Sequence, residues 1–317
     1  MDRLWSVVFG GVMLAALLLF VVAPFVPGWW LPPDVSTYGQ GIDYLFYLIL
    51  GITGFFFVLT EGILVYALYR FAYKPGVKAP YIHGNHRLEV IWTLVPGVIL
   101  FLLALWQINV WADIKYKTRM PTPETAAIQL EVSARQWEWR LRYPSPARFA
   151  SWQSNPQLAR DFATNVHEDD LRLVNEVHIW KGSKEKPERV LVHLKTQDVL
   201  HSFFLPNLRI KQDALPGKTI PVWFAATESN VVPVTDIATQ QARWFEEGYN
   251  IRTGQTSRPD LVWELACAEF CGSRHSLMRG KLYVHKDRED FVRWLESAEA
   301  EQSRTQPAPA ATATAAR

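Results

Sequence analysis

The side chains best suited to chemistry stand together near the end of the chain. Its only two cysteines, Cys267 and Cys271, are four positions apart, and His275 and Met278 follow them closely. In an exported domain the default interpretation of two cysteines is a disulfide. A disulfide across so short a loop would remove little entropy from the unfolded chain, so it would stabilise the fold poorly. Two thiolates, an imidazole and a thioether are instead the soft donor set that selects copper.

Sharing of the two thiolates would make this site dinuclear. Two bridging thiolates can hold two copper ions, so that an added electron is delocalised over the pair and little geometry changes. Each ion then needs one terminal imidazole, and His275 supplies the first. Among the eight histidines of the chain we select His201 as the second, because a strand gives way to a loop there and the loops of a sandwich gather at its ends. The alternative for His201 is a core histidine satisfied by its neighbours.

Three long apolar stretches indicate membrane spans. Each exceeds the roughly 20 residues that cross a hydrocarbon core of about 30 Å; they are Leu4 to Val26, Tyr44 to Tyr69 and Val90 to Ala112. The connection from Arg70 to Arg87 carries four bases and no acid, so the positive-inside rule places it in the cytoplasm. Everything after Trp111 then lies on the outer face, which in a bacterium is the periplasmic side of the cytoplasmic membrane.

We therefore predict a transmembrane helical hairpin within residues 44–112, in contact with the lipid bilayer. Residues 1–26 are either a retained helix or a cleaved export signal; their apolar run is long for a signal and no clear cleavage site follows, so we favour the helix. Glu61 is a charge inside the hairpin and needs a partner there, but the sequence assigns it no role. The net charge of +2 gives no sign of a nucleic-acid partner.

The external part, residues 118–285, has the texture of a β domain. Short alternating runs such as Ile128 to Ser133 and Lys281 to His285, separated by turn residues, predict an antiparallel β-sandwich or barrel. Two polar stretches, 145–170 and 228–258, interrupt this rhythm as insertions, and we expect a short helix in each, around 240–247 in the second. Residues 286–301 have the spacing of an amphipathic helix, and the Ala-, Thr- and Pro-rich residues 302–317 are expected to be a disordered tail.

Five sequence runs resemble subunit II of the haem–copper cytochrome c oxidases. The most specific is the twelve-residue run Cys267-Ala-Glu-Phe-Cys271-Gly-Ser-Arg-His275-Ser-Leu-Met278. The others are Asp198-Val-Leu-His-Ser-Phe203, Lys211-Gln-Asp-Ala-Leu-Pro-Gly217, Glu89-Val-Ile-Trp-Thr93 and Gln136-Trp-Glu-Trp139. The resemblance implies an α+β membrane protein in which a transmembrane helical hairpin precedes a cupredoxin-like Greek-key β-sandwich.

The resemblance also implies a function. Such a subunit accepts electrons from cytochrome c at a dinuclear copper centre and passes them to haem in subunit I of a proton-pumping oxidase, which reduces oxygen to water together with other oxidase subunits. This chain lacks the histidine-bearing helices that would hold haem, and it lacks a Cys-x-x-Cys-His motif for a covalent haem of its own. The oxygen-reducing site is therefore expected on another subunit.

The family's metal ligands map onto this sequence by resemblance. Cys267 and Cys271 would bridge the two coppers, His201 and His275 would be the terminal ligands, and Met278 would be a weak axial ligand. The backbone carbonyl of Glu269 would lie near the second copper, and its carboxylate would reach a magnesium ion at the boundary with the catalytic subunit.

Two further residues receive roles by resemblance. Trp137 matches the position where electrons enter from cytochrome c; the alternative is that Trp137 and Trp139 share one sheet face as ordinary packing. Glu138, between them, departs from the family, which often has an aromatic residue there. Glu89 matches a position linked to proton uptake, and the alternative is that it merely balances Arg87 or other nearby bases.

Other parts and other functions stay open at this stage. Arg209 stands where the family usually has a small residue, and it would pair with Asp213 or with a neighbouring subunit. The insertions would bind an additional subunit or a tethered cytochrome. The competing functions are a copper-containing nitric oxide reductase subunit, a quinol oxidase subunit, which would lack the Cys and His ligands, and a structural membrane-anchored sandwich with one disulfide.

Overall fold

A computed structural model describes residues 3–78, 81, 83–152, 154–183, 185–235 and 242–305. The chain forms two compact units. One contains Met1–Pro32 and Gln40–Arg119, and the other contains Pro33–Gly39 and Met120–Arg317.

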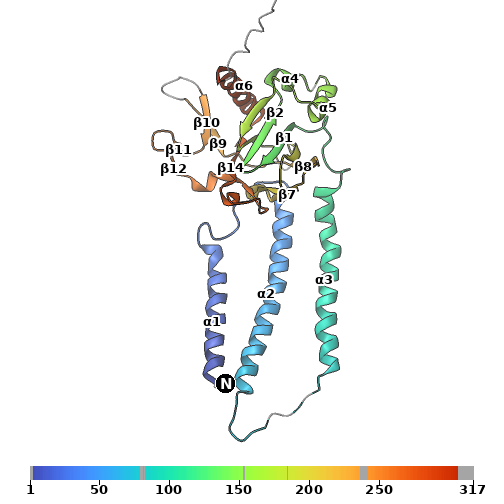
Figure 1. The fold of residues 1–317 in the computed structure, drawn as a ribbon, viewed down its shortest axis with the longest axis vertical. Coiled ribbons are helices and arrows are strands. Elements are labelled where there is room, and N and C mark those ends of the chain that lie inside the picture. Colours follow the sequence, from blue (N-terminus) through green and yellow to red (C-terminus); the bar gives the residue numbers. More distant parts are fainter. Residues whose placement is uncertain are drawn as a thin grey trace, which may run out of the picture. The chain divides into compact units, whose positions relative to one another are not determined.

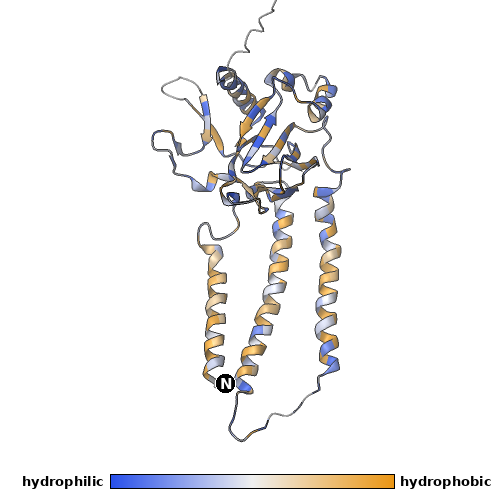
Figure 2. Cartoon of the chain, in the orientation of Figure 1, coloured by the Kyte–Doolittle hydropathy of each residue, from blue (hydrophilic) through white to orange (hydrophobic). Residues whose placement is uncertain are grey.

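Three long helices make up the first unit (Figure 1). They are α1 (Arg3–Val22), α2 (Gly39–Arg70) and α3 (His86–Lys115), and a short 3₁₀ helix, η1 (Ala23–Phe25), follows α1. Each long helix has the length and apolar composition needed to cross a membrane. In Figure 2 orange predominates along these helices, with paler and a few blue turns between. Asn85 caps the start of α3: its side chain accepts hydrogen bonds from the backbone N–H groups of Arg87 and Leu88, a standard N-cap arrangement.

Two five-stranded sheets make up the core of the second unit. The first has the order β3-β2-β1-β5-β8 and the second the order β4-β14-β13-β6-β7. The strands of the first are β1 (Ile128–Arg135), β2 (Glu138–Tyr143), β3 (Leu171–Val174), β5 (Val190–Thr196) and β8 (Ile220–Phe224). Those of the second are β4 (Glu176–Trp180), β6 (His201–Leu205), β7 (Ile210–Ala214), β13 (Trp263–Cys267) and β14 (Arg279–His285).

The predicted sandwich is therefore confirmed, although the sheets are mixed. β1 pairs in parallel with β5, and β14 pairs in parallel with β4, so the expectation of a purely antiparallel domain was wrong for these two pairs. Between the two strands of each parallel pair, the chain contributes at least one strand to the opposite sheet. Parallel neighbours need such a crossover, because a tight hairpin can join only antiparallel strands.

The core lies between the two sheets. Ile128, Leu130 and Val132 of β1 and Ile179 of β4 are fully buried, and each such side chain contributes about 1.5–3 kcal/mol when removed from water. Gln129, on the other face of β1, is also buried, because it donates a 2.9 Å hydrogen bond to the carbonyl of Ala159 in the first insertion. The insertion thus covers part of the outer sheet face.

The two insertions have different structures. The first contains two short helices, α4 (Pro146–Ser151) and α5 (Pro156–Thr164). The second contains the hairpin of β9 (Val231–Thr235) with β10 (Ala242–Glu246) and the small pair β11 (Tyr249–Asn250) with β12 (Gln255–Thr256). The helix expected around 240–247 was wrong within 242–246, because Trp244 and Phe245 favour the extended state and pair with the valine-rich β9.

The C-terminal helix α6 (Arg288–Thr305) packs against the domain through Phe291, Trp294 and Leu295, all buried. It continues through residues 302–305, which were expected to belong to the tail. The remainder of the predicted disordered tail, 306–317, lies outside the described residues.

Candidate metal centre

The predicted ligands come together from two places in the second sheet. His201 is the first residue of β6, and Cys267 is the last residue of β13. These strands are hydrogen-bonded neighbours, with Cys267 opposite Phe203. The loop that follows β13 turns back through the short 3₁₀ helix η4 (His275–Leu277) into β14, so one loop presents the remaining donors beside the edge where β6 begins.

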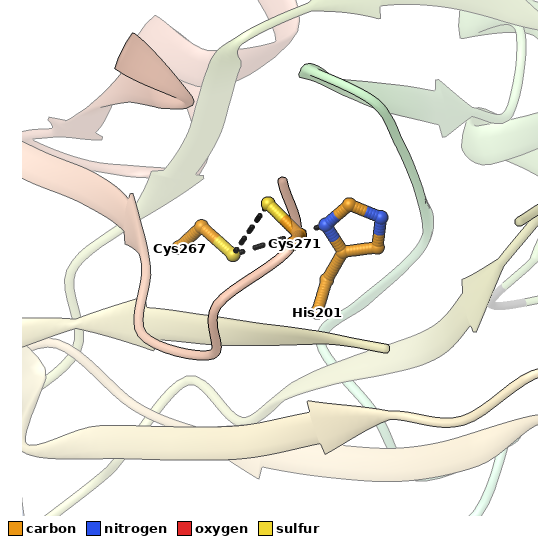
Figure 3. Close-up of side chains that lie close together, drawn as sticks. All are labelled: His201, Cys267 and Cys271. Atoms are coloured by element: carbon orange, nitrogen blue, oxygen red, sulfur yellow. Dashed lines mark hydrogen bonds between the residues drawn. The ribbon is translucent and has the colours of Figure 1, made fainter. Parts of the chain in front are cut away.

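The two sulfur atoms form the centre of the cluster (Figure 3). Cys267 Sγ and Cys271 Sγ are 3.8 Å apart, and both cysteines are free thiols. His201 Nδ1 lies 3.8 Å from Cys267 Sγ, and His275 Nδ1 lies 3.6 Å from Cys271 Sγ. Each sulfur therefore faces a different imidazole. The donor atoms of His201, Cys267 and Cys271 all lie within 4.8 Å of one another, close enough to share a metal ion.

Two weaker donors complete the set. Met278 Sδ is 3.9 Å from Cys271 Sγ, and Met278 is buried. On the other side, the backbone carbonyl oxygen of Glu269 is 3.2 Å from Cys267 Sγ. The structure thus gathers all six predicted metal-site residues around the two sulfurs, in an arrangement with one imidazole and one weak donor on each side.

The two thiols differ in acidity. Burial raises the pKa of Cys267, but hydrogen bonds with His201 and with the backbone at Ser202 and Glu269 outweigh burial and lower that pKa to about 6. Burial and the neighbouring Cys267 charge raise the pKa of Cys271 to about 12. Ionisation of Cys267 thus opposes ionisation of Cys271, as expected for two acids that share a site. A bound cation would be needed to hold both thiolates near neutral pH.

Asp198 orients His201, and the sequence analysis assigned it no role. Its Oδ1 accepts a 2.8 Å hydrogen bond from His201 Nε2 and a 2.7 Å hydrogen bond from the backbone N–H of Val199. A proton on Nε2 leaves Nδ1 unprotonated and directed at the sulfurs, the arrangement typical of metal-ligating histidines. Burial alone lowers the pKa of His201, but Cys267 and Asp198 outweigh it and hold that pKa above its usual value.

Trp137 lies in the turn between β1 and β2 and touches the ligand loop. A side-chain carbon added at Gly272, whose φ is +118°, would lie 3.3 Å from the Trp137 ring. Gln136 Nε2 donates a 2.7 Å hydrogen bond to the carbonyl of Cys271, and the Gln136 backbone N–H donates one to Asp198 Oδ2. Trp139, the next residue but one, is fully buried and its ring centroid lies 6.2 Å from that of His201. Trp137 is partly exposed.

Three other residues considered in the sequence lie away from these donors in the chain. Glu89 is in the first turn of α3, half-exposed, 3.7 Å from His86. Glu61 lies within α2, and its shielded Oε2 makes no hydrogen bond with any described residue. Arg209, with a φ of +55°, donates to the carbonyl of Pro206 at 2.7 Å.

Two family models match the chain. The one described as cytochrome c oxidase subunit II, transmembrane domain, matches residues 27–110, and the one described as cytochrome c oxidase subunit II, periplasmic domain, matches residues 128–234. The second match ends before the ligand loop at Cys267. The geometry of that loop is therefore an observation separate from the family match.

Individual relatives cover most of the chain. It is 27% identical over 293 residues to the alternative cytochrome c oxidase subunit 2 of Bradyrhizobium diazoefficiens, covering 90% of this chain and 91% of that protein. It is 26% identical over 280 residues to cytochrome c oxidase subunit 2 of Cereibacter sphaeroides, covering 84% and 78%. Among solved structures, the periplasmic domain of cytochrome oxidase subunit II of Bradyrhizobium japonicum aligns with a TM-score of 0.35 and 19% identity, covering 56% of this chain and 96% of that one.

Proposed function

Since the chain belongs to the cytochrome c oxidase subunit II family, we propose that it is the electron-entry subunit of a proton-pumping haem–copper terminal oxidase. In this proposal its external domain binds two copper ions and receives electrons from cytochrome c or a related carrier. The electrons leave for haem in the catalytic subunit, where oxygen is reduced to water.

The observation that carries the proposal is the pairing of each sulfur with its own imidazole. His201 Nδ1 approaches Cys267 at 3.8 Å, and His275 Nδ1 approaches Cys271 at 3.6 Å. A structural disulfide needs no histidines beside it, and a site for a single ion needs no second bridging sulfur. The six donors thus fit a pair of copper ions, since sulfur and imidazole are the ligands that copper prefers.

The residues of the chain divide the work of such a site. A bound copper pair supplies a one-electron acceptor whose charge is spread over both ions. Cys267 and Cys271 would hold the copper ions, and Met278 and the backbone carbonyl of Glu269 would supply the weaker donors. Asp198 fixes the tautomer of His201, and the burial of Cys271 and Met278 keeps water away from their two sulfur atoms.

Trp137 is the proposed entry point for electrons. Its indole packs on Gly272, the residue that follows Cys271 in the ligand loop, and the adjacent Gln136 is hydrogen-bonded to the carbonyl of Cys271. The π-system therefore lies in contact with the loop that carries the metal ligands, while part of it stays exposed to a donor protein.

Two acidic residues receive more peripheral roles. We propose that the Glu269 carboxylate, which is exposed, reaches a magnesium ion shared with the catalytic subunit, because magnesium prefers oxygen ligands. We propose Glu89 for proton uptake at the cytoplasmic mouth of α3, since it is exposed in the first helical turn. The oxidase is proposed to lie in the bacterial cytoplasmic membrane, surrounded by lipid and bound to the other oxidase subunits.

Copper loading of the full-length chain in detergent tests the proposal. We expect two coppers per chain, and a paramagnetic spectrum in which one unpaired electron couples to two equivalent copper nuclei. The His275→Ala variant removes one terminal imidazole, so the coupling should become unequal. A colourless, silent protein, or the spectrum of a single isolated copper, would overturn the proposal.

A further inference from the structure

We propose that Gln136 is a positioning residue for electron entry: it holds the Trp137 indole against the ligand loop by tethering the turn that carries both residues. The inference rests on the proposed function, in which Trp137 receives the electron from the donor protein. It goes further by naming the side chain that fixes the contact between Trp137 and the metal centre.

Apolar packing is the main contact that holds the Trp137 ring. The ring packs against the hydrophobic core, whereas its Nε1 makes no hydrogen bond with any described residue. The guanidinium carbon of Arg274 lies 6.0 Å from the ring centre, at the outer limit of a cation–π contact. Apolar packing has no preferred direction, and the ring lies in a turn, where chains move more than in strands. Its position therefore depends on how the turn is attached to the ligand loop.

The Gln136 side chain supplies the first tether. Its Nε2 donates a 2.7 Å hydrogen bond to the backbone carbonyl of Cys271, a copper ligand in the proposed function. The next residue, Gly272, has a φ of +118°, and a side-chain carbon added to it would lie 3.0 Å from Gln136 Nε2 and 3.3 Å from the Trp137 ring. Because Gly272 has no side chain, the amide and the indole can both lie on the same stretch of the ligand loop.

The Gln136 backbone supplies the second tether. Its N–H donates a 2.7 Å hydrogen bond to Asp198 Oδ2, and Asp198 Oδ1 accepts the 2.8 Å hydrogen bond from His201 Nε2. The turn is therefore attached to both segments that carry proposed ligands, through Cys271 on one side and through His201 on the other. Replacing the Gln136 side chain removes the first tether and leaves the second, so the contribution of the side chain can be measured separately.

The contacts of Gln136 suit a role in positioning. Its side chain is exposed, so it fills no space in the core, and the atom that it binds is a backbone carbonyl outside the proposed donor set. Loss of its amide should therefore leave the donor atoms in place. It should instead loosen the contact between Trp137 and the ligand loop, and a reacting group misplaced by about 1 Å can lose up to about 100-fold in rate.

The test follows electron entry in the purified, copper-loaded oxidase by stopped-flow absorption. The probe is reduced mitochondrial cytochrome c, used both in its native form and with its lysines succinylated, so that both signs of charge are offered to the surface. The haem iron of the probe loses one electron, the copper centre gains it, and no bond or proton is exchanged. The limiting rate at saturating probe reports electron transfer within the complex, whereas the half-saturating concentration reports binding.

The Gln136→Met variant removes the amide donor, keeps a similar length and adds no charge. We expect the limiting rate to fall about tenfold, within the range that a small misplacement causes, while the half-saturating concentration stays unchanged. Copper content, the paramagnetic spectrum and the reduction potential should also stay at their wild-type values. The matched control is Gln197→Met, because Gln197 is likewise exposed and its amide donates a 3.2 Å hydrogen bond to Ser133 Oγ. The control should keep the wild-type limiting rate.

A double-mutant cycle shows whether Gln136 acts through Trp137. The Trp137→Ala variant should be slower than Gln136→Met, and adding Gln136→Met to it should cause no further loss of rate. Independent effects that multiply would overturn the inference, because Gln136 would then act on the copper centre without Trp137.

The outcomes separate the two proposals. A wild-type limiting rate in Gln136→Met overturns the positioning role and leaves the electron-entry function standing. A slower rate that comes with lost copper, a changed spectrum or a shifted potential does the same, since Gln136 would then support the metal centre itself. A wild-type oxidase whose copper is reduced by neither form of the probe overturns the electron-entry function.

Discussion

Two histidine pairs in the external domain meet different neighbours. At the metal centre, the ring nitrogens of His201 and His275 face sulfur at 3.8 and 3.6 Å. In the second pair, His178 Nδ1 and His285 Nε2 face each other at 3.1 Å, and His285 Nδ1 lies 3.0 Å from Asp290 Oδ2. The first pair presents nitrogen to soft donors, and the second pair presents nitrogen to hydrogen-bonding groups.

Packing separates the two pairs further. His178 is stacked on Trp294, with ring centroids 3.9 Å apart and planes at 8°, and on Tyr283 at 4.5 Å. Asp290 also accepts from Trp244 Nε1 and from Arg293. This second cluster ties α6 and the β9–β10 hairpin to the sheet. His201 also has a carboxylate partner, Asp198, so the difference that the comparison teaches is the second ring nitrogen: it faces a free thiol in the candidate metal centre and only hydrogen-bonding groups in the His178–His285 cluster.

The Cys271→Ser variant should have the largest effect and should act on the metal centre alone. Serine keeps the shape but removes a bridging thiolate, so we expect the shared copper pair to be lost, as measured by copper content and by the paramagnetic spectrum. The free energy of unfolding of the metal-free chain should change little. Retention of two equivalent coppers would contradict the assignment of Cys271 as a bridge.

Asp290→Ala should do the reverse. It leaves the buried His285 and the partly exposed Trp244 and Arg293 without their acceptor, and removing a buried partner from such a network costs about 3 kcal/mol. Urea unfolding of the full-length chain in detergent, followed by tryptophan fluorescence, measures the loss. Copper stoichiometry at saturating metal should stay at the wild-type value. A loss of copper together with stability would show that the candidate metal centre depends on the His178–His285 cluster.

Asp198→Ala should weaken the metal centre by an intermediate amount. Without the acceptor on Nε2 the His201 ring can adopt the wrong tautomer and orientation, and loss of such a partner typically costs 10–100-fold in metal affinity, roughly 1.4–2.7 kcal/mol. Competition with a copper chelator measures the affinity. Equal affinity in the variant and the wild type would show that the β6 backbone alone orients the ring.

The pH dependence should distinguish the pairs by its sign. Burial lowers the pKa of both His178 and His285, and the neighbouring His285 lowers that of His178 further. Below about pH 6.5 the unfolded chain therefore binds more protons at these two residues than the folded chain does. Their stabilising contribution is complete above about pH 6.5 and is lost as the pH falls towards the folded pKa values. His201, with a raised pKa, contributes stability below about pH 6.5 that is lost as the pH rises through its folded pKa.

Unfolding of the metal-free chain at pH 7.0 and 5.5 checks this sign. The wild type should lose about 1 kcal/mol more on acidification than His178→Gln does, because each buried neutral histidine contributes up to about 1.4 kcal/mol per pH unit. His193, whose pKa burial lowers to about 4, is present in both chains and cancels in the comparison. An equal loss of unfolding free energy in both chains would show that His178 does not contribute to the pH dependence.

The residues of the candidate metal centre could be selected because most of them are local in sequence. Cys267, Cys271, His275 and Met278 lie on one loop, so residue types and spacing carried the chemistry. His201 required a prediction of which loop meets that one. The stated basis, a strand that ends at His201, was wrong, because His201 follows a loop and is the first residue of β6. The role of Asp198 was not predicted. An acid three residues before a histidine does not indicate a hydrogen bond between them until the start of β6 fixes the direction of the His201 ring.

The fold was predictable where a single period dominated the pattern. The three apolar helices follow from length alone, and the sandwich follows from alternation. The parallel pairs β1–β5 and β4–β14 were missed because pairing partners are chosen by the path of the chain between sheets. The β10 strand was missed because a short polar segment with two aromatic residues fits a helix equally well until β9 lies beside it.

The adjacency of β6 and β13 has a consequence for how the protein is made. His201 and Cys267 are 66 positions apart, and the whole β9–β12 excursion lies between them in the chain. During synthesis and export the histidine therefore emerges long before either thiolate, and no complete ligand set exists until β13 has found β6. Under the proposed function, copper insertion would therefore follow the pairing of β13 with β6, which completes the ligand set.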